Sequence, residues 1–519
     1  MHINLPHTFG RSVWKRRHHQ TQLAASKPDE VRRTAALQIA LRYMTMQASD
    51  CCPPEPLSVF NQCSPRGYIS IVLCFPCNDD RREEAVHHIR QSLSRLADER
   101  PLFAGRLYAT EDGRAHILRS RAYDIPLEVV SSGNGEEADY EQLRRAEFPP
   151  AKFVDSRYGV PGLGDSNGAL CPVSKVSITF ARGGLLLSIF LQHAITDGSS
   201  LRVFLEAFGN QTRYISGCLP SEQELRIPST RLPSAASHKL SQLSAFKRLV
   251  KTCPEYVILP DLSGPTQPRP QITGRPISSV NKIGKIFVFN SDKLRQLRKL
   301  IQAKNKSDTL PTAYISLATL AFAHITKARI ATEPQLTEIE PSQTAELWNS
   351  VNWRTRAFPG ATENYFGNAV LPAVTSVSRE QVKAACYDDG ELARLAPFVK
   401  NSIDAVDEEH VTRRMSMMSQ APDPRMVGVN YDPRSPEVLA FNTWRHFGAD
   451  IEWDIPGVPV TKPDTIRRAT GGWGLGTALI LPAKEDSKRQ ELFVSLSVDA
   501  MEALCRDARW RIWVDRIIG

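Results

Sequence analysis

The histidine at position 193 stands in a sequence context that suits acid–base chemistry. It follows the apolar run 185–191 and precedes Asp197 by four positions, within the letters QHAITDG. A histidine at the end of a buried strand is held rigidly, and rigid placement is what a general base requires. We therefore take His193 as the candidate base. The alternative is a histidine in a structural role at a strand end, with Asp197 only capping the turn.

The segments on either side of His193 predict how it is positioned. Residues 175–191 predict a β-hairpin, and its second arm, LLLSIFL, is apolar on both faces, which indicates a buried central strand. The apolar spacing over 201–208 predicts a helix after the turn, with Ser199 or Ser200 as its N-cap. Gly198 lies where a positive φ would let the chain turn.

Both halves of the chain mix strand and helix patterns without a regular β–α–β alternation, which favours an α+β fold. Residues 216–280 are rich in proline, serine and threonine, with one predicted helix at 240–252, and this indicates a long crossover between two lobes. We expect a peripheral N-terminal extension at 1–50, an N-terminal lobe at 51–215 that carries His193, the crossover at 216–280, and a C-terminal lobe at 281–519.

Composition excludes several classes of protein. The 519 residues include 65 Lys and Arg against 56 Asp and Glu, a net charge of +9 that is spread along the chain, so we expect no nucleic-acid partner. No apolar window reaches the roughly 18 residues of a membrane span. Ten cysteines with a lone C-x-x-C at 74–77 provide neither a disulfide scaffold nor a zinc site. With no apolar leader at the N-terminus, we expect a cytoplasmic monomer without a metal.

Further motifs follow one another in a fixed order. They are LSVFNQ at 57–62, PLFAGR at 101–106, QHAITDG at 192–198, VNWRTR at 351–356, YFGN at 365–368, NTW at 442–444 and DIEWD at 450–454. In these motifs the sequence resembles the BAHD acyltransferases, the CoA-thioester-dependent family of plants, and in particular their fungal relatives such as the trichothecene acetyltransferases. It departs from the family pattern at Asn61, which replaces Asp, at Asn442, which replaces Thr, and at Glu452 and Asp454, which replace two glycines.

The resemblance implies two similar-sized lobes with mixed sheets flanked by helices, as in chloramphenicol acetyltransferase-like folds, and a channel between the lobes. It also implies transfer of an acyl group, with acetyl expected, from acyl-CoA to a hydroxyl of a fungal secondary metabolite. His193 would be the general base, and no cofactor would be tightly bound. Two other interpretations stay open: a condensation enzyme that acts on carrier-bound thioesters, and a non-catalytic relative that binds a metabolite.

The resemblance assigns roles to residues outside the His193 turn. Trp444 Nε1–H and the Asn442 amide are candidates to stabilise the oxyanion of the attacked thioester, a contribution of about 2.7–4 kcal/mol per donor; for Trp444 a packing role is the alternative. In the family the equivalent of Asp197 pairs with an arginine, which maps to Arg354. This pair, with Gly198, would hold the shape of the turn rather than polarise His193.

Two further candidates lie in the second half. Asp450 opens the segment that stands where the family has its D-F-G-W-G motif and is a candidate site residue, and we expect its carboxylate to hold a loop near the CoA channel. Lys285 opens a predicted strand and is a candidate ligand for a CoA phosphate; a solvated lysine is the alternative.

A G-x-S-x-G pattern at 164–168 raises the possibility of a serine hydrolase. The nucleophile elbow of those enzymes requires a buried strand before the serine and a helix after it. Here loop-forming residues lie on both sides of the pattern. The sequence therefore argues against a hydrolase.

Overall fold

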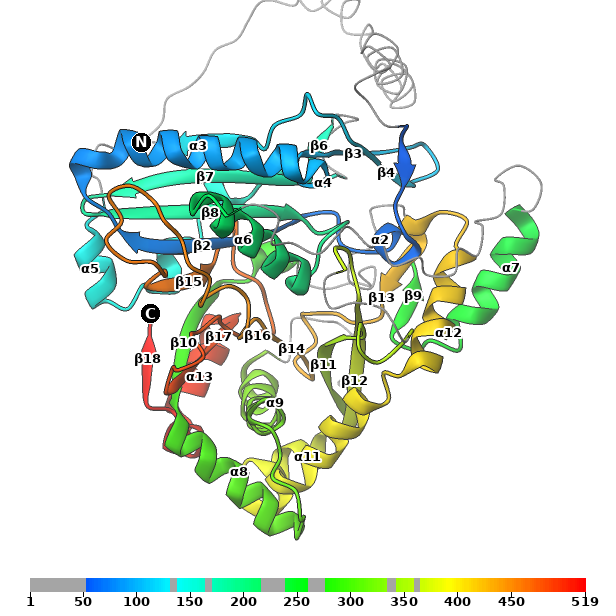
Figure 1. Ribbon diagram of the computed structural model, residues 1–519. Helices are drawn as coiled ribbons and strands as arrows, with labels where there is room; N and C mark the ends of the chain where they lie inside the picture. The colour runs from blue at the N-terminus through cyan, green and yellow to red at the C-terminus, as the bar shows by residue number, and fades with distance from the viewer. Residues whose placement is uncertain are drawn as a thin grey trace, which may run out of the picture.

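The computed structural model describes residues 53–130, 138–163, 170–215, 239–259, 276–333, 342–358 and 365–519. They form two lobes, each built on a mixed β-sheet with helices beside it (Figure 1). This confirms the predicted α+β fold class. The expected extension at 1–50 and the G-x-S-x-G segment at 164–168 lie outside the described residues.

The first lobe is built on a five-stranded sheet in the order β15-β2-β8-β7-β5. Its strands are β2 Tyr68–Pro76, β5 Leu127–Val130, β7 Ser174–Ala181, β8 Gly184–Gln192 and β15 Thr465–Arg468. The predicted hairpin is confirmed, because β7 and β8 pair antiparallel along their whole length. All nine residues of β8 are buried, as expected for a central apolar strand.

Two helices cover one face of this sheet. They are α3 Arg82–Glu99 and α6 Gly198–Thr212, and their apolar side chains join those of β2 and β8 in one buried cluster. The other elements of the first half are α2 Val59–Gln62, α4 Pro101–Ala104, α5 Tyr140–Arg145 and a small sheet of β1 Glu55–Pro56, β4 Ala115–Leu118, β3 Arg106–Ala109 and β6 Cys171–Pro172.

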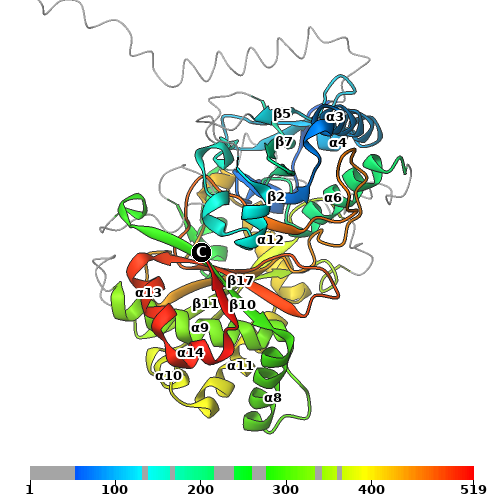
Figure 2. The ribbon, with the colours of Figure 1, turned by 90° about the vertical axis from the view of Figure 1, so that its left-hand side faces the viewer.

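The second lobe is built on a seven-stranded sheet in the order β12-β11-β14-β16-β17-β10-β18. Its strands are β10 Lys282–Asn290, β11 Thr344–Asn352, β12 Val370–Ser378, β14 Val438–Thr443, β16 Thr477–Ile480, β17 Arg489–Ser497 and β18 Arg516–Ile518. The helices gather on the side of the sheet away from the first lobe (Figure 2). They are α8 Ser291–Asn305, α9 Ala313–Thr332, α10 Arg379–Ala385, α11 Asp389–Asp404, α13 Val498–Arg506 and α14 Ala508–Trp513.

The chain does not divide between the lobes as simply as 51–215 and 281–519. Strand β15 comes from the second half but pairs antiparallel with β2 of the first sheet. Its Ile466 lies opposite Leu73, and both side chains are buried in the first-lobe cluster. Burial of this apolar side chain gives a physical reason for the strand to cross over.

The expected crossover contains regular structure. Helix α7 Lys239–Val250 matches the predicted helix, and β9 Tyr256–Ile258 pairs with β13 Val427–Val429. Helix α12 Glu408–Ser419 lies beside α7 (Figure 1). The crossover therefore packs against the second half instead of only linking the lobes.

Candidate active site

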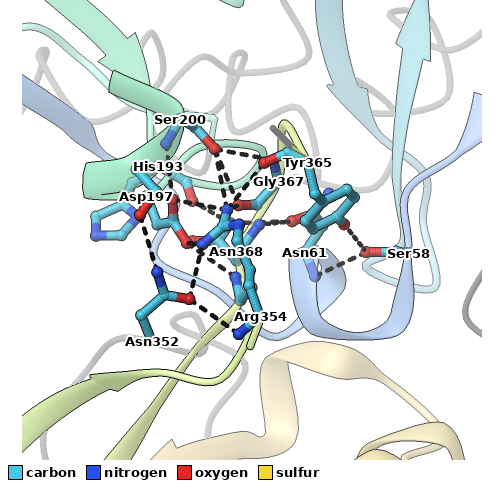
Figure 3. Close-up of polar contacts among 12 residues, drawn as sticks. Ser58, Asn61, His193, Asp197, Ser200, Asn352, Arg354, Tyr365, Gly367 and Asn368 are labelled. Atoms are coloured by element: carbon cyan, nitrogen blue, oxygen red, sulfur yellow. Dashed lines mark hydrogen bonds and ion pairs between the residues drawn. The ribbon is translucent and has the colours of Figure 1, made fainter. Parts of the chain in front are cut away.

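His193 follows the last residue of β8, at the point where the chain leaves the first sheet. Its main-chain N–H donates to Gly67 O at 2.8 Å, and the residue is half-buried. Nδ1 is enclosed and has no hydrogen-bond partner among the described residues, whereas Nε2 is not enclosed in this way. Nε2 is therefore the less enclosed of the two ring nitrogens. Figure 3 shows the ring pointing away from the neighbouring polar cluster.

Burial lowers the pKa of His193 below its ordinary value of 6.5. Smaller opposing effects come from the backbone oxygens of His193 and Thr196, from the charge of Asp197 and from Asn368. None of these contacts has hydrogen-bond geometry at Nδ1. Because the depressed pKa favours the neutral ring, His193 is in the form that can accept a proton at neutral pH.

Asp197 is the N-cap of α6, so the predicted N-caps Ser199 and Ser200 are wrong. Its Oδ1 accepts a hydrogen bond from Ser200 N at 2.9 Å, and its Oδ2 accepts one from Ala369 N at 2.9 Å. Asp197 is 2% exposed. A carboxylate is a better cap than a hydroxyl here because it can also serve an arginine.

That arginine is Arg354, as the resemblance implied. Nη1 lies 2.8 Å from Asp197 Oδ2 and Nη2 lies 3.0 Å from Oδ1, a bidentate pair. Nη2 also donates to Tyr365 O at 3.0 Å and to Gly367 O at 2.7 Å. With Arg354 1% exposed, the pair is a buried ionic contact that joins the two lobes.

The segment 365–369 of the second lobe docks onto the His193 turn. Asn368 Nδ2 donates to His193 O at 2.8 Å, and Gly367 N donates to Ser200 Oγ at 2.9 Å. The Phe366 ring centroid lies 5.0 Å from that of Phe103 in the first lobe. Polar and apolar contacts from successive residues of this segment therefore fix the turn from the second lobe.

Gly198 does not have the positive φ that the sequence suggested, since it is absent from the residues with left-handed backbone among those described. Its small size matters for another reason. A Cβ at this position would overlap the ring of Phe447. Phe447 N donates to Trp444 O at 2.9 Å, so this close approach brings the turn after β14 against the start of α6.

Trp444 and Asn442, the candidate oxyanion donors, lie at the end of β14. Trp444 is half-buried and packs against the apolar clusters of both lobes. Its Nε1 makes no hydrogen bond with the described residues and is not enclosed. Asn442 Oδ1 accepts a hydrogen bond from Thr443 N at 2.7 Å, which leaves the amide nitrogen as the donor. Both N–H groups can thus serve a ligand.

Asp450 and Lys285 have protein partners elsewhere. Asp450 Oδ1 lies 3.2 Å from Lys462 Nζ, and Oδ2 accepts a hydrogen bond from Glu485 N at 2.8 Å, so this carboxylate ties two loops. Lys285 Nζ donates to Gly519 O. These contacts connect neither residue to the His193 cluster.

Two residues of the site, Asn61 and Asn368, belong to sequence motifs that do not by themselves assign them a role. The structure places Asn61 Oδ1 2.8 Å from Asn368 N and 3.0 Å from Asn368 Nδ2. The order of the motifs indicates that these residues belong to the site, but it does not predict which motifs are in contact.

The sequence matches the Transferase family over residues 163–509 and the trichothecene 3-O-acetyltransferase-like N-terminal domain over 68–209. The first match covers well over half of the chain. The chain belongs to the BAHD acyltransferase family, in its fungal branch.

The relatives of this BAHD acyltransferase include two fungal O-acetyltransferases. The trichothecene 8-O-acetyltransferase of Fusarium sporotrichioides is 22% identical over 495 residues, 88% of this chain and 97% of the relative. The eremophilane O-acetyltransferase ORF8 of Penicillium roqueforti is 22% identical over 365 residues, 65% of this chain and 74% of the relative.

Solved structures share the BAHD fold. TRI101 of F. graminearum, solved with coenzyme A and T-2 mycotoxin, superposes with a TM-score of 0.70 at 17% identity and covers 90% of this chain and 100% of its own. Vinorine synthase superposes with a TM-score of 0.56, also at 17% identity, over 90% of this chain and 98% of its own.

Two further observations concern the described part of the BAHD acyltransferase. None of its helices is long and apolar enough to cross a membrane. Nor does it bring together three or more His, Cys, Asp or Glu side chains that could hold a metal ion.

Proposed function

We propose that this acyltransferase transfers an acetyl group from acetyl-CoA to a hydroxyl of a fungal secondary metabolite, with His193 as the general base. The observation that carries the proposal is the environment of His193: its main-chain N–H is held by Gly67 O, burial lowers its pKa, and Nε2 is less enclosed than Nδ1. The fungal O-acetyltransferases among the relatives support the choice of reaction and acceptor class.

The timing of proton transfer follows from magnitudes. A histidine titrates near 6.5 and an alcohol near about 15.7, the value of bulk water. The gap of about nine units corresponds to about 12 kcal/mol, and burial of His193 widens it. The alcohol therefore cannot ionise beforehand. Nε2 takes the proton while the acceptor oxygen attacks the thioester carbonyl, a contribution of about 10²–10⁴-fold.

Charge then develops on the carbonyl oxygen. We propose that Trp444 Nε1–H and the Asn442 amide N–H are donors to that oxygen, because both lack a partner among the described residues at the end of β14. Collapse of the tetrahedral intermediate breaks the carbon–sulfur bond. The CoA thiol has a pKa of about 8.5 by analogy with cysteine, so the thiolate leaves with little help from an acid.

We assign Asp197 and Arg354 to the shape of the site and not to proton transfer. The carboxylate of Asp197 is fully used by Arg354, Ser200 N and Ala369 N. A catalytic dyad would need this carboxylate at Nδ1 of the histidine. Asp450 is likewise occupied by protein partners, Lys462 and Glu485 N, and we propose that it holds two loops together. We also propose that acyl-CoA and the acceptor reach His193 through a channel between the lobes.

The test is an assay of the purified full chain with acetyl-CoA and a panel of hydroxylated trichothecene and eremophilane acceptors. Release of CoA thiol and a mass gain of one acetyl group on an acceptor are the expected results. His193→Ala should lower turnover by at least about 10²-fold while the melting temperature stays near that of the wild type. His87→Ala, at an exposed histidine of α3, is the matched control. Turnover of His193→Ala within about tenfold of wild type would remove His193 from the mechanism.

A further inference from the structure

The main-chain oxygen of His193 is held by a side chain from the opposite lobe. Asn368 Nδ2 donates to it at 2.8 Å, and Asn368 is 4% exposed. The main-chain N–H of His193 is held independently by Gly67 O at 2.8 Å. Both hydrogen-bonding groups of the His193 backbone are therefore fixed, one by each lobe. Figure 3 shows Asn368 beside the His193 turn.

Asn368 is in turn oriented by Asn61, which is 5% exposed and lies in α2. One oxygen, Asn61 Oδ1, accepts from both the main-chain N–H and the side-chain amide of Asn368. A primary amide nitrogen has two hydrogens, and here one goes to Asn61 and the other to His193 O. The arrangement assigns the amide of Asn368, since the flipped rotamer would place oxygen against two acceptors.

Placement of the backbone decides where the imidazole points. Nδ1 has no hydrogen-bond partner among the described residues, so no side chain holds the ring directly at that nitrogen. The orientation of Nε2 depends instead on packing and on the position of the main chain. A shift of about 1 Å in such a group can cost about 10²-fold in rate.

We propose that Asn61 and Asn368 are positioning residues for the general base, and that they hold the His193 backbone so that Nε2 meets the acceptor hydroxyl. The inference rests on the proposed role of His193. The resembling family motif has Asp at the position of Asn61. A carboxylate at 61 would keep both acceptor contacts with Asn368 and add a negative charge beside the residue that holds the His193 backbone, which should raise the pKa of His193.

Asp197, on the same turn, is a charged group that acts on His193, and it is paired with Arg354 of the second lobe. Helix α2 and the segment 365–369 bring the uncharged side chains of Asn61 and Asn368 to the His193 backbone. A new carboxylate at 61 would therefore add a second negative charge on this side of the His193 turn.

The test compares Asn368→Ala, Asn61→Ala and Asn61→Asp with Asn349→Ala. Asn349 is an equally buried asparagine of β11 whose Oδ1 accepts from Tyr314 Oη at 2.8 Å. Asn368→Ala should lower kcat by up to about 10²-fold with KM for both substrates within about twofold. Asn61→Asp should move the acidic limb of the kcat/KM profile to higher pH. Asn349→Ala should lose stability without either effect.

A second measurement separates this inference from the proposed function. The ring of His193 is titrated by NMR in the full chain with labelled histidine, with its signal assigned through His193→Gln. In Asn61→Asp the titration midpoint should move upward. An Asn368→Ala or Asn61→Ala variant with wild-type kcat overturns the positioning role, and an unmoved midpoint in a folded Asn61→Asp chain overturns the electrostatic effect of position 61 on His193. A moved midpoint with an unchanged pH–rate profile sustains the contact with His193 but removes His193 as the base.

Discussion

The carboxylate of Asp197 faces the guanidinium of Arg354, with N–O distances of 2.8 and 3.0 Å. The two residues are 157 positions apart in the chain and come from different lobes. Their pairing closes the turn that carries His193 against the second lobe. The short spacing between His193 and Asp197 therefore serves lobe assembly, and a change at either member of the pair should be felt first as a loss of stability.

Asp197→Asn should destabilise the protein more than it damages the chemistry. It leaves Arg354 buried without a counter-charge, and breaking a buried pair in this way costs about 3–5 kcal/mol. Urea unfolding should show this loss, while kcat of the folded fraction falls far less than in His193→Ala. Exposed pairs provide the control: Glu84→Gln, which breaks the contact with Arg81 on the surface, should hardly change stability. A variant that melts normally but has no activity would instead indicate a His–Asp dyad.

The pH dependence of catalysis should follow from the buried ring. Because burial holds the pKa of His193 below 6.5, kcat/KM should rise with pH through an ionisation below that value and be level near neutrality. A profile measured from about pH 5 to pH 8 covers the range in which histidine titrates. An acidic limb centred well above 7 would contradict the assignment.

The free energy of unfolding should also depend on the titration of His193, and like kcat/KM it should fall as the pH falls. Between the depressed pKa of folded His193 and about 6.5 in the unfolded chain, the unfolded chain binds one more proton. The free energy of unfolding should therefore fall as the pH falls through this window, by at most about 1.4 kcal/mol per unit. The free energies of unfolding of the wild type and of His193→Gln, measured by urea titration at a series of pH values, should diverge only within this pH window. Parallel curves through the window would mean that the ring is not buried as described.

Gly198→Ala should destabilise the contact between α6 and the turn after β14. The backbone of Gly198 is ordinary, so the cost comes from overlap of the new Cβ with the Phe447 ring and should be about 1–3 kcal/mol. A second change, Phe447→Leu, should recover part of it. Gly472→Ala, where an added Cβ meets nothing within 4 Å, is the control. Equal melting temperatures for Gly198→Ala and Gly472→Ala would show that the close packing is unimportant.

Trp444→Phe keeps most of the apolar contact and removes the indole N–H. If that N–H serves the oxyanion, kcat should fall by about 10²–10³-fold with little change in melting temperature, because the group has no partner among the described residues. Asn442→Asp separates the second donor, since it retains the acceptor for Thr443 N and removes the amide hydrogens. Wild-type kcat in both variants would leave the oxyanion without an assigned donor.

Elements with strong local patterns could be predicted from the sequence. The hairpin of β7 and β8 has alternating or continuous apolar runs around a glycine-containing turn, and the structure confirms it. Strand β14, by contrast, lies in the centre of the second sheet and gains its parallel neighbours β11 and β16 only through contacts distant in sequence. The local pattern does not predict these pairings.

The ends of helices also depend on contacts that are distant in sequence and that the local pattern does not predict. The pattern over 501–511 predicts one helix, whereas the structure has α13 and α14 separated at Asp507. Asp507 caps α14, and its Oδ2 lies 2.9 Å from both His324 Nδ1 and Lys327 Nζ of α9. A contact with a different helix thus interrupts a periodicity that is locally continuous.

The family, the central strand and His193 as the candidate base could all be predicted from the amino-acid order, because these depend on residues that are adjacent or ordered along the chain. The folded structure was needed to show that Asp197 caps α6 instead of Ser199 or Ser200, that Phe447 requires a residue without Cβ at 198, and that Asn368 reaches the His193 backbone. The last two contacts cross between segments far apart in sequence. Their geometry is set by how two separately packed cores meet, and a one-dimensional pattern carries no information about that distance.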